Sequence, residues 1–203
     1  GNNGIYAYSI AEKKVIRALK SPQGARLEQL QVTVSGRVIL SGRNGIFELV
    51  EDAWVPLNLT LPSEDFQCQS VVIDKNEKIF LGGAYLIQRY QLEGSGKVTL
   101  EQEYPIESLA RTGGLSSEGQ PIIGSEGVGI LLIDDSGVQR EIAFDDSLSK
   151  RPAGVYQDGA GAYWVGSREL GISYYMEGRW VGYGPLQGVP SGKCSFIGTD
   201  PSG

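Results

Sequence analysis

Short runs of apolar residues recur along this chain, and polar turns rich in Gly, Asp and Ser separate them. The runs return with a period of about 42 residues, four runs to a period. The third run of each period starts at an isoleucine, and successive isoleucines lie 41 to 43 residues apart. They are Ile5, Ile46, Ile87, Ile130 and Ile172. A regular spacing of this length predicts stacked supersecondary units.

Two further anchors keep the same period. A turn residue between the first and second runs recurs as Gly36, Glu77, Gly119, Gly161 and Gly203. A glycine at the end of the second run recurs as Gly42, Gly82, Gly124 and Gly166. Asp74, Asp158 and Asp200 stand three residues before turn anchors. Asp side chains can hydrogen-bond the backbone of a tight turn, so we expect these residues to cap their turns.

The four runs of each period predict four short strands. They are rich in β-branched residues and Gly, and no apolar stripe with a 3.6-residue period persists. Helix pairs of similar repeat length are therefore disfavoured. The predicted first strands are 27–34, 68–74, 153–158 and 194–200; the second are 38–42, 79–82, 122–124 and 163–166; the third are 45–49, 86–90, 129–133 and 171–175; the fourth are 54–57, 98–100, 140–142 and 180–183.

Four-stranded meanders stacked around an axis form a β-propeller, so the predicted fold class is all-β. We expect a single domain over residues 1–203, most simply with five blades of about 42 residues. Its last blade would combine residues 193–203 with 1–19, and residues 10–19 would connect two strands. A section of a larger propeller is the alternative. Trp164 is expected in the core, whereas Trp54 and Trp180 are matched outer-strand residues expected to pack between blades.

Composition narrows the function classes. Apolar residues make up 40% of the 203 residues and charged residues 21%, an ordinary globular balance. The net charge is −6, which disfavours nucleic acid as a partner because phosphate neutralisation supplies much of that affinity. No apolar run approaches the roughly 18 residues that a membrane-spanning helix needs. We therefore predict neither nucleic-acid binding nor a membrane span.

The chain contains no histidine, which removes the Ser-His-Asp triad, His-ligated zinc and the commonest general base. It also lacks a phosphate loop and a dinucleotide fingerprint. Asp134 and Asp135 are interpreted as a solvated turn. Cys68 and Cys194 occupy equivalent positions of different repeats and are expected to be free, mostly buried thiols. We predict no catalytic residue, no metal and no cofactor, hence not an enzyme.

The fourth period carries the most specific motif. Residues 156–167 read YQDGAGAYWVGS, followed by GISYY at 171–175 and GVPS at 188–191. This resembles the two-component regulator propeller repeat, whose pattern runs D-x-x-G-x-h-W-h-G-T, then G-h-x-x-Y, then G-L-P-S (h is apolar). In other periods the Trp becomes Ile39, Phe80 or Ile122. The resemblance implies an extracytoplasmic sensor propeller, periplasmic or at the cell surface, that acts in bacterial signal transduction and often responds to carbohydrates.

Candidate ligand-binding residues lie where the innermost strands begin and where the second strand turns into the third. First strands line the axial channel of a propeller, and cations at its mouth would focus an anion there. Irregular loops on a rigid ring are typical recognition sites. The strand-start candidates are Arg26, Gln67, Arg111, Arg151 and Lys193, and the loop candidates are Arg43, Tyr85, Glu126 and Arg168.

The leading functional hypothesis is a non-enzymatic recognition module that binds a small molecule or glycan, such as a carbohydrate or anion, on the axial face. Its other partner would be a neighbouring domain or subunit. One alternative is a protein-docking scaffold without a small ligand. A third is a propeller glycosidase or lyase, and the absence of histidine weighs against the lyase. A fold by itself does not decide between these functions.

Overall fold

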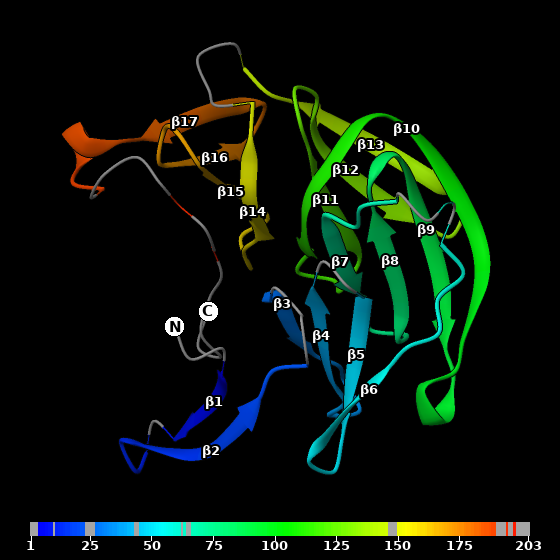
Figure 1. The fold of residues 1–203 in the computed structure, drawn as a ribbon. Helices are drawn as coiled ribbons and strands as arrows, with labels where there is room; N and C mark the ends of the chain where they lie inside the picture. Colours follow the sequence, from blue (N-terminus) through cyan, green and yellow to red (C-terminus); the bar gives the residue numbers. More distant parts are fainter. Residues whose placement is uncertain are drawn as a thin grey trace. The chain divides into compact units, whose positions relative to one another are not determined.

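A computed structural model describes residues 4–9, 11–22, 27–42, 45–61, 63, 66–145, 150–189, 194 and 197. These residues form antiparallel strands and two short 3-10 turns (Figure 1). The chain divides into two compact units, which are described separately. Unit 1 comprises Gly1–Leu59 and Glu93–Val98, and unit 2 comprises Thr60–Leu92 and Thr99–Gly203.

Unit 1 contains one two-stranded and one four-stranded sheet, each a meander in chain order. The strands are β1 (Gly4–Ser9), β2 (Lys14–Lys20), β3 (Leu27–Val32), β4 (Val38–Gly42), β5 (Gly45–Val50) and β6 (Ala53–Pro56), and the 3-10 turn η1 covers Gly94–Gly96. Residues 14–20 form a strand, where the sequence predicted only a connection. Antiparallel pairing such as Ile5 with Leu19 outweighs the helix propensity of this stretch.

Unit 2 contains a seven-stranded and a four-stranded sheet, again with neighbours in chain order. The seven-stranded sheet holds β7 (Ser70–Ile73), β8 (Lys78–Gly82), β9 (Ala84–Leu92), β10 (Val98–Leu115), β11 (Pro121–Ser125), β12 (Gly129–Asp134) and β13 (Gly137–Ala143). The four-stranded sheet holds β14 (Pro152–Gln157), β15 (Tyr163–Ser167), β16 (Ile172–Met176) and β17 (Arg179–Tyr183), and the 3-10 turn η2 covers Pro185–Gln187. The predicted four-run pattern is therefore confirmed in these repeats.

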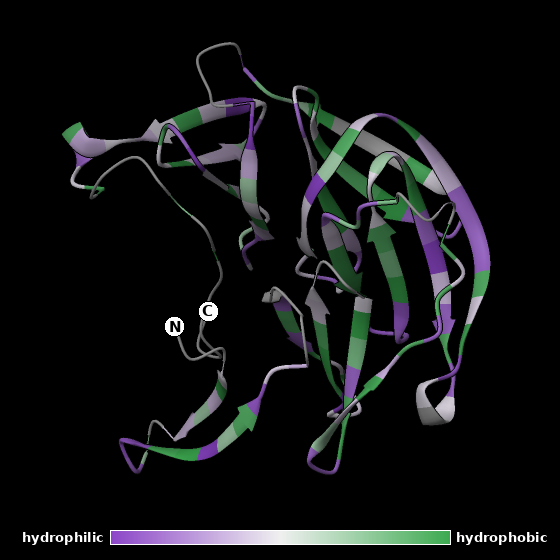
Figure 2. Ribbon diagram, viewed as in Figure 1, coloured by the Kyte–Doolittle hydropathy of each residue, from purple (hydrophilic) through white to green (hydrophobic). Residues whose placement is uncertain are grey.

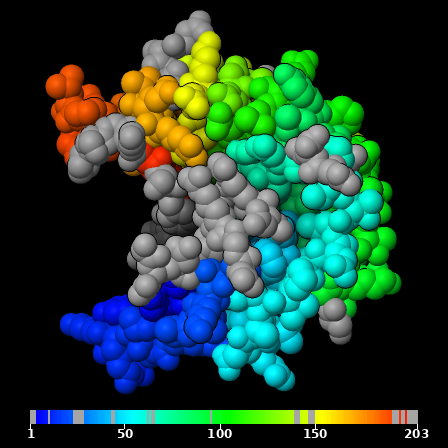
Figure 3. Space-filling view, viewed as in Figure 1, coloured from blue at the N-terminus to red at the C-terminus, as the bar shows by residue number. Residues whose placement is uncertain are grey.

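Strand β10 joins two repeats. It is 18 residues long and serves as the fourth strand of one meander and the first strand of the next. The sequence predicted only a short fourth strand here, over residues 98–100. Residues 98–112 contain no glycine, and the extended backbone continues through the one proline of this stretch, Pro105. Strand β10 is hydrogen-bonded to β9, and in the space-filling view the green atoms of this part of the chain lie next to teal ones (Figure 3).

The turns are capped as the sequence predicted. The Asp74 carboxylate accepts hydrogen bonds from the backbone N–H groups of Asn76 (2.9 Å) and Lys78 (2.8 Å). Asp158 accepts equivalent bonds from Ala160 (3.0 Å) and Ala162 (2.9 Å). In other repeats the hydroxyl oxygens of Thr33 and Ser116 take this role. Asp200 lies outside the described residues.

The signature tryptophan completes one of these caps. The Trp164 indole N–H donates to the second carboxylate oxygen of Asp158 at 2.7 Å. Partial burial raises the pKa of Asp158, but the Trp164 and backbone hydrogen bonds outweigh it and hold the pKa below its usual value. Trp164 is only partly buried, which differs from the predicted core position, because its indole lies beside the Asp158 turn and the Tyr174 ring.

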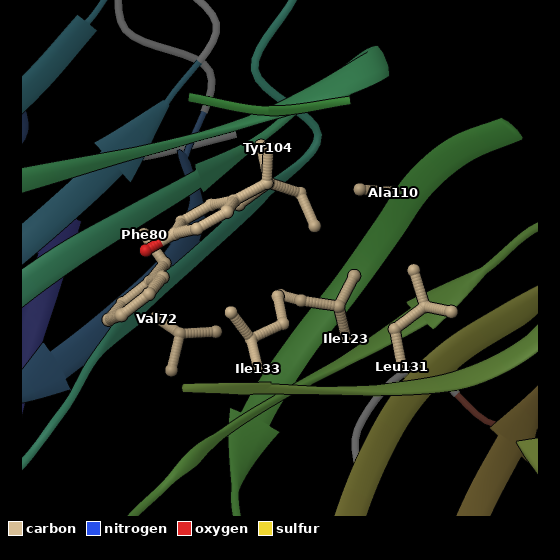
Figure 4. Close-up of a cluster of buried hydrophobic side chains, with 8 residues drawn as sticks. Val72, Phe80, Tyr104, Ala110, Ile123, Leu131 and Ile133 are labelled. Atoms are coloured by element: carbon tan, nitrogen blue, oxygen red, sulfur yellow. The ribbon is translucent and has the colours of Figure 1, made fainter. Parts of the chain in front are cut away.

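Two hydrophobic clusters hold unit 2 together. The first joins β7, β8 and β9 to β10, β11 and β12 (Figure 4): Val72, Phe80, Ile87, Tyr104, Ala110, Ile123, Leu131 and Ile133. The second joins β11, β12 and β13 to β14 and β15: Ile122, Ile130, Ile142, Val155, Tyr163 and Val165. Neighbouring Ile122 and Ile123 point into different clusters. The meander that contains β11 and β12 is thus covered on both faces, which explains why β12 is hydrophobic along most of its length (Figure 2).

The anchor glycines mark where one repeat touches the next. A Cβ atom on Gly82 would stand 2.5 Å from the Cβ of Ala110, and one on Gly124 would stand 3.0 Å from the Cβ of Pro152. A side chain on Gly166 would collide with Cys194. Ala110 lies on the part of β10 that pairs with β11, and Pro152 begins β14. The recurring glycine therefore reflects close approach between repeats, not turn geometry.

Backbone hydrogen bonds repeat with this contact. The Ala110 N–H donates to the Gly83 carbonyl at 3.0 Å, and the Cys194 N–H donates to the Ser167 carbonyl at 2.7 Å. In each bond the acceptor is the carbonyl of the residue after an anchor glycine, Gly82 or Gly166. Cys68 and Cys194 form no disulfide and are partly buried, where the sequence predicted mostly buried thiols.

The matched tryptophans also pack as predicted. The Trp54 indole N–H donates to the Lys20 carbonyl at 3.0 Å within unit 1. The Trp180 indole N–H donates to the Ala143 carbonyl at 2.9 Å within unit 2, and its ring lies 5.6 Å from that of Phe144. In both cases the outer strand of one repeat is tied to the end of the preceding one.

A polar network is buried beside these clusters. The Tyr90 hydroxyl is fully buried and lies 2.6 Å from the Thr60 carbonyl and 2.8 Å from Gln88 Oε1. The Gln88 amide in turn donates to Glu103 at 2.7 Å. Burial, with smaller contributions from Glu103 and Cys68, raises the pKa of Tyr90 to about 12.

This raised pKa predicts alkaline destabilisation. Unfolded chains release a tyrosine proton near pH 10, whereas folded Tyr90 keeps its proton to about 12. Stability from Tyr90 is therefore complete below pH 10 and is lost as the pH rises toward 12, by up to about 3 kcal/mol. Urea unfolding at successive pH values should show this slope, and Tyr90→Phe should flatten it. An unchanged slope in Tyr90→Phe would contradict the assignment.

The contact between repeats predicts a second stability effect. Gly82→Ala should lower the free energy of unfolding by about 1–3 kcal/mol, because the added methyl overlaps Ala110. Gly159→Ala is the matched control, since a Cβ there meets no atom within 4 Å and Gly159 does not have a positive φ. That control should be neutral or slightly stabilising. Equal effects in the two variants, measured by urea unfolding, would rule out the contact as the reason for the glycine.

Candidate functional site

The candidate site lies in unit 2, where first strands begin. The pairing of β10 with β11 shifts register between Ala110 and Thr112, which leaves Arg111 on a β-bulge. β14 has the same irregularity between Pro152 and Gly154. Bulges redirect a side chain and are frequent next to functional sites. Ala110 packs on Gly82. The bulge, and not the regular pleat, then determines the direction of the Arg111 side chain.

Glu126 receives the Arg111 side chain. The Nε of Arg111 donates to Glu126 Oε2 at 2.6 Å. The backbone of the Glu126 loop is fixed from both sides. Its N–H donates to the Leu109 carbonyl at 2.9 Å, its carbonyl accepts from the Ser108 hydroxyl at 2.5 Å, and the Gly127 N–H donates to the Lys150 carbonyl at 2.9 Å. The carboxylate is therefore held between β10 and the start of β14.

Arg151 and Glu169 extend the row of charges. Arg151 Nε lies 3.4 Å from Glu126 Oε1, and its Nη1 lies 3.3 Å from Glu169 Oε1. The Ser167 hydroxyl fixes the Glu169 loop by accepting from the N–H groups of Glu169 and Leu170, each at 3.0 Å. We call Arg111, Glu126, Arg151 and Glu169 the strand-end network.

Arg111 retains unused donors. Its side chain is 16% exposed, and only its Nε is engaged by Glu126. Within the described ranges, no residue accepts a hydrogen bond from its Nη1 or Nη2. A planar guanidinium fixed at one edge, with its outer nitrogens reaching solvent, can bind a carboxylate, a phosphate or a polar oxygen.

Gln67 and Tyr85 lie on segments that adjoin Arg111. The Gly83 carbonyl accepts from Ala110, and a Cβ on Gly83 would meet the Gln67 carbonyl at 3.1 Å. Tyr85 is 68% exposed and has a φ of 61°. A bulky residue with positive φ stores backbone strain. Because the Tyr85 ring is exposed, burial of this side chain does not offset the strain of its backbone.

The structure brings some predicted site residues together and leaves others apart. Arg111, Glu126 and Arg151 are joined directly, with Gln67 and Tyr85 on adjoining segments. Arg168 is exposed and has no ion-pair partner among the described residues. Arg26, Arg43 and Lys193 lie outside the described residues. Their role in the site stays a prediction.

Two contributors were not predicted from the sequence. Counting from the anchors selects Arg168, but the neighbouring Glu169 is the residue that reaches Arg151. Ser108 fixes the Glu126 loop through a side chain on the middle of β10, a strand the sequence did not reveal. The anion-focusing interpretation rested on Arg26, Arg151 and Lys193. Of these only Arg151 is described, and two carboxylates neutralise it.

A second charged cluster joins the first two meanders of unit 2. Buried Arg89 contacts Asp135 at 2.7 Å and Glu101 at 3.0 Å, the latter without a hydrogen-bonding angle at Nε. Lys78 contacts the same two carboxylates. Asp134 accepts from the Ser136 N–H and hydroxyl, and these bonds lower the pKa of Asp134. The Asp134 turn is thus capped as a turn, while Asp135 ties repeats together.

Two negative findings concern the described residues. Within them, no three Cys, Asp or Glu side chains gather closely enough to hold a metal ion. None of the helical segments in the same ranges has the length and apolar character to cross a membrane.

The chain resembles solved propeller structures at low sequence identity. No family model matches the sequence, and no curated protein matches it significantly. Virginiamycin B lyase from Staphylococcus aureus, as the selenomethionine-substituted protein, matches with a TM-score of 0.68 and 18% identity over 90% of this chain. Its catalytically inactive H270A form with quinupristin gives 0.70 and 19%, also over 90%. A protein of unknown function from Bacteroides caccae gives 0.64 and 13%, over 89% of this chain and 68% of its own.

These similarities establish the fold class, an all-β propeller built of antiparallel meanders. The chain spans 63% of the length of the lyase. The prediction that the protein is not an enzyme was wrong as an inference from this architecture, because an enzyme shares the fold. The absence of histidine excludes histidine-based sites, but it does not exclude enzymatic chemistry in general.

The strand-end network predicts unequal roles for its two carboxylates. Glu126→Gln should lower the free energy of unfolding by about 1 kcal/mol, because two guanidinium groups lose their shared partner and the Arg111 side chain is largely buried. Glu169→Gln is the matched control, with an expected change within about 0.5 kcal/mol because both partners are half-exposed. Chemical unfolding of both variants measures the difference. A larger effect at Glu169 would contradict the central position of Glu126.

Proposed function

We propose that this chain is a ligand-recognition propeller whose strand-end network binds a small molecule or glycan. One observation carries the proposal: Arg111 is fixed on a bulge by Glu126, and its outer nitrogens have no acceptor among the described residues. Of the five N–H donors of this guanidinium, those on Nη1 and Nη2 thus remain available to a ligand. The backbone bonds of the Glu126 loop make the arrangement rigid before a ligand arrives, which reduces the entropy lost on binding.

The wider biological role is proposed from the family resemblance. The motif at residues 156–167 supports an extracytoplasmic sensor propeller of a bacterial two-component regulator. In that role, ligand binding would change how the propeller docks to a neighbouring domain or subunit. The capped Asp158 turn and its bond to Trp164 give this motif a structural function in unit 2. The motif thus supports membership of the repeat class, whereas the network supports binding.

The binding proposal predicts ligand-dependent thermal stabilisation. A panel of neutral sugars, acidic oligosaccharides and small anions is tested by thermal unfolding. A true ligand at about 100 times its Kd adds about 2.7 kcal/mol, a shift of roughly 5 °C or more for a chain of this size. Arg111→Ala should abolish the shift and Arg111→Lys should weaken it, while exposed Arg179→Ala on β17 should retain it.

The outcomes separate the candidate functions. A shift that survives Arg111→Ala places the binding site elsewhere and refutes the role of the network. A flat panel with a cooperative melt favours a protein-docking scaffold.

Similarity of the fold to virginiamycin B lyase favours lyase activity as a second candidate. That lyase is inactive as H270A, and the present sequence contains no histidine. A lyase reaction here would need another base. Incubation with quinupristin, followed by chromatography, tests it directly. Consumption of quinupristin would favour the lyase candidate.

A further inference from the structure

Charge alternates along the strand-end network. Arg111, Glu126, Arg151 and Glu169 follow one another as cation, anion, cation and anion, with successive contacts of 2.6, 3.4 and 3.3 Å. They come from four segments: the β10 bulge, the β11–β12 loop, the residue before β14 and the β15–β16 loop. The local charge of the four side chains sums to zero, within a chain whose net charge is −6.

A simple anion is a poor match for this arrangement. It would be attracted to the Arg111 guanidinium and repelled by the Glu126 carboxylate that is bonded to the same group. Arg151 offers no better site, because it already faces Glu126 and Glu169. A simple cation would be attracted to the Glu126 carboxylate and repelled by the Arg111 guanidinium that is bonded to it. A ligand that carries both charges a few ångströms apart gains both attractions and suffers the smallest repulsion.

The remaining hydrogen-bonding capacity matches such a ligand. The outer nitrogens of Arg111 offer donors for a carboxylate in the planar, two-pronged geometry that guanidinium groups favour. An ionised carboxylate has about four acceptor positions, so Glu126 keeps free lone pairs after contacting both arginines. These can accept from an ammonium group. Glu126 is 31% exposed and Arg151 is 47% exposed, so both reach solvent.

We propose that the strand-end network recognises the zwitterionic head of a free α-amino acid. Its carboxylate binds Arg111 and its ammonium binds Glu126. The inference rests on the proposed binding function of the same network and names its ligand class. The proposal includes a contact between the amino acid's side chain and the exposed ring of Tyr85, which follows Gly83 by two residues on the segment bonded to Ala110.

The test uses one carbon skeleton with each charge removed in turn. Alanine carries both charges, N-acetylalanine only the carboxylate, and alaninamide only the ammonium. At equal ionic strength, alanine should raise the Tm of the 203-residue chain, and its Kd from calorimetry should be at least tenfold lower than that of either blocked form. A screen of the other common amino acids then identifies the preferred side chain.

Variants show whether binding occurs at the network. Arg111→Ala and Glu126→Gln should each weaken alanine binding at least tenfold, and Arg179→Ala should leave it unchanged. Arg111→Lys, with a measured melting curve for each unliganded variant, separates lost binding from lost folding. Alanine binding that is unaffected by both Arg111→Ala and Glu126→Gln would overturn the inference.

The two proposals fail in different ways. If N-acetylalanine or a sugar binds as tightly as alanine, and Arg111→Ala abolishes that binding, the network is a ligand site but the zwitterion inference is wrong. If no amino acid, sugar or anion binds the folded chain, both proposals fall.

Discussion

Close contact between each anchor glycine and the next repeat is the constraint on which unit 2 depends. Gly82 and Gly124 lie against Ala110 and Pro152 with no room for a side chain between them. This approach sets the distance between successive meanders, and the two hydrophobic clusters fill the space that remains. The same contact also positions the candidate site. Ala110 is held against Gly82, and the bulge directs the next residue, Arg111, toward Glu126. The same contact thus shapes packing and candidate function.

Most of the fold in the described ranges could be predicted from the sequence. Repeats need glycine wherever two backbones meet, and the hydrogen bonds that cap the turns need Asp, Ser or Thr, so both recur with the repeat and can be counted. The full length of strand β10 was not predicted, because the only sequence sign of it is the absence of a glycine between its two halves. Strand formation at residues 14–20 was not predicted, because it results from pairing with β1 and not from local propensity. Pairing depends on distant residues that a local pattern does not reveal.

The site was less predictable than the fold. Repeat positions pointed to Arg111, Glu126 and Arg151, because equivalent positions meet at one edge of unit 2. The loops after Gly124 and Gly166 are equally long, so counting selected Arg168 as the equivalent of Glu126. The contact is instead made by Glu169, one residue further along, and only the conformation of the loop decides this. The net charge of the site was also not predicted. The cations could be read from the sequence, but their pairing with carboxylates could not. The enzyme prediction failed for a related reason: one missing residue type excludes certain mechanisms, whereas a fold can support others.

The continuous strand β10 has a consequence for how this chain can change over evolution. Repeat proteins gain and lose units by duplication or deletion, and such events leave the fold intact when their boundaries fall in loops. Between the first two meanders of unit 2 there is no loop, since one strand of 18 residues belongs to both. A boundary there would cut a shared backbone and move Arg111 out of register. We therefore expect these two meanders to be inherited as a pair, with repeat number varying elsewhere in the family of sequences.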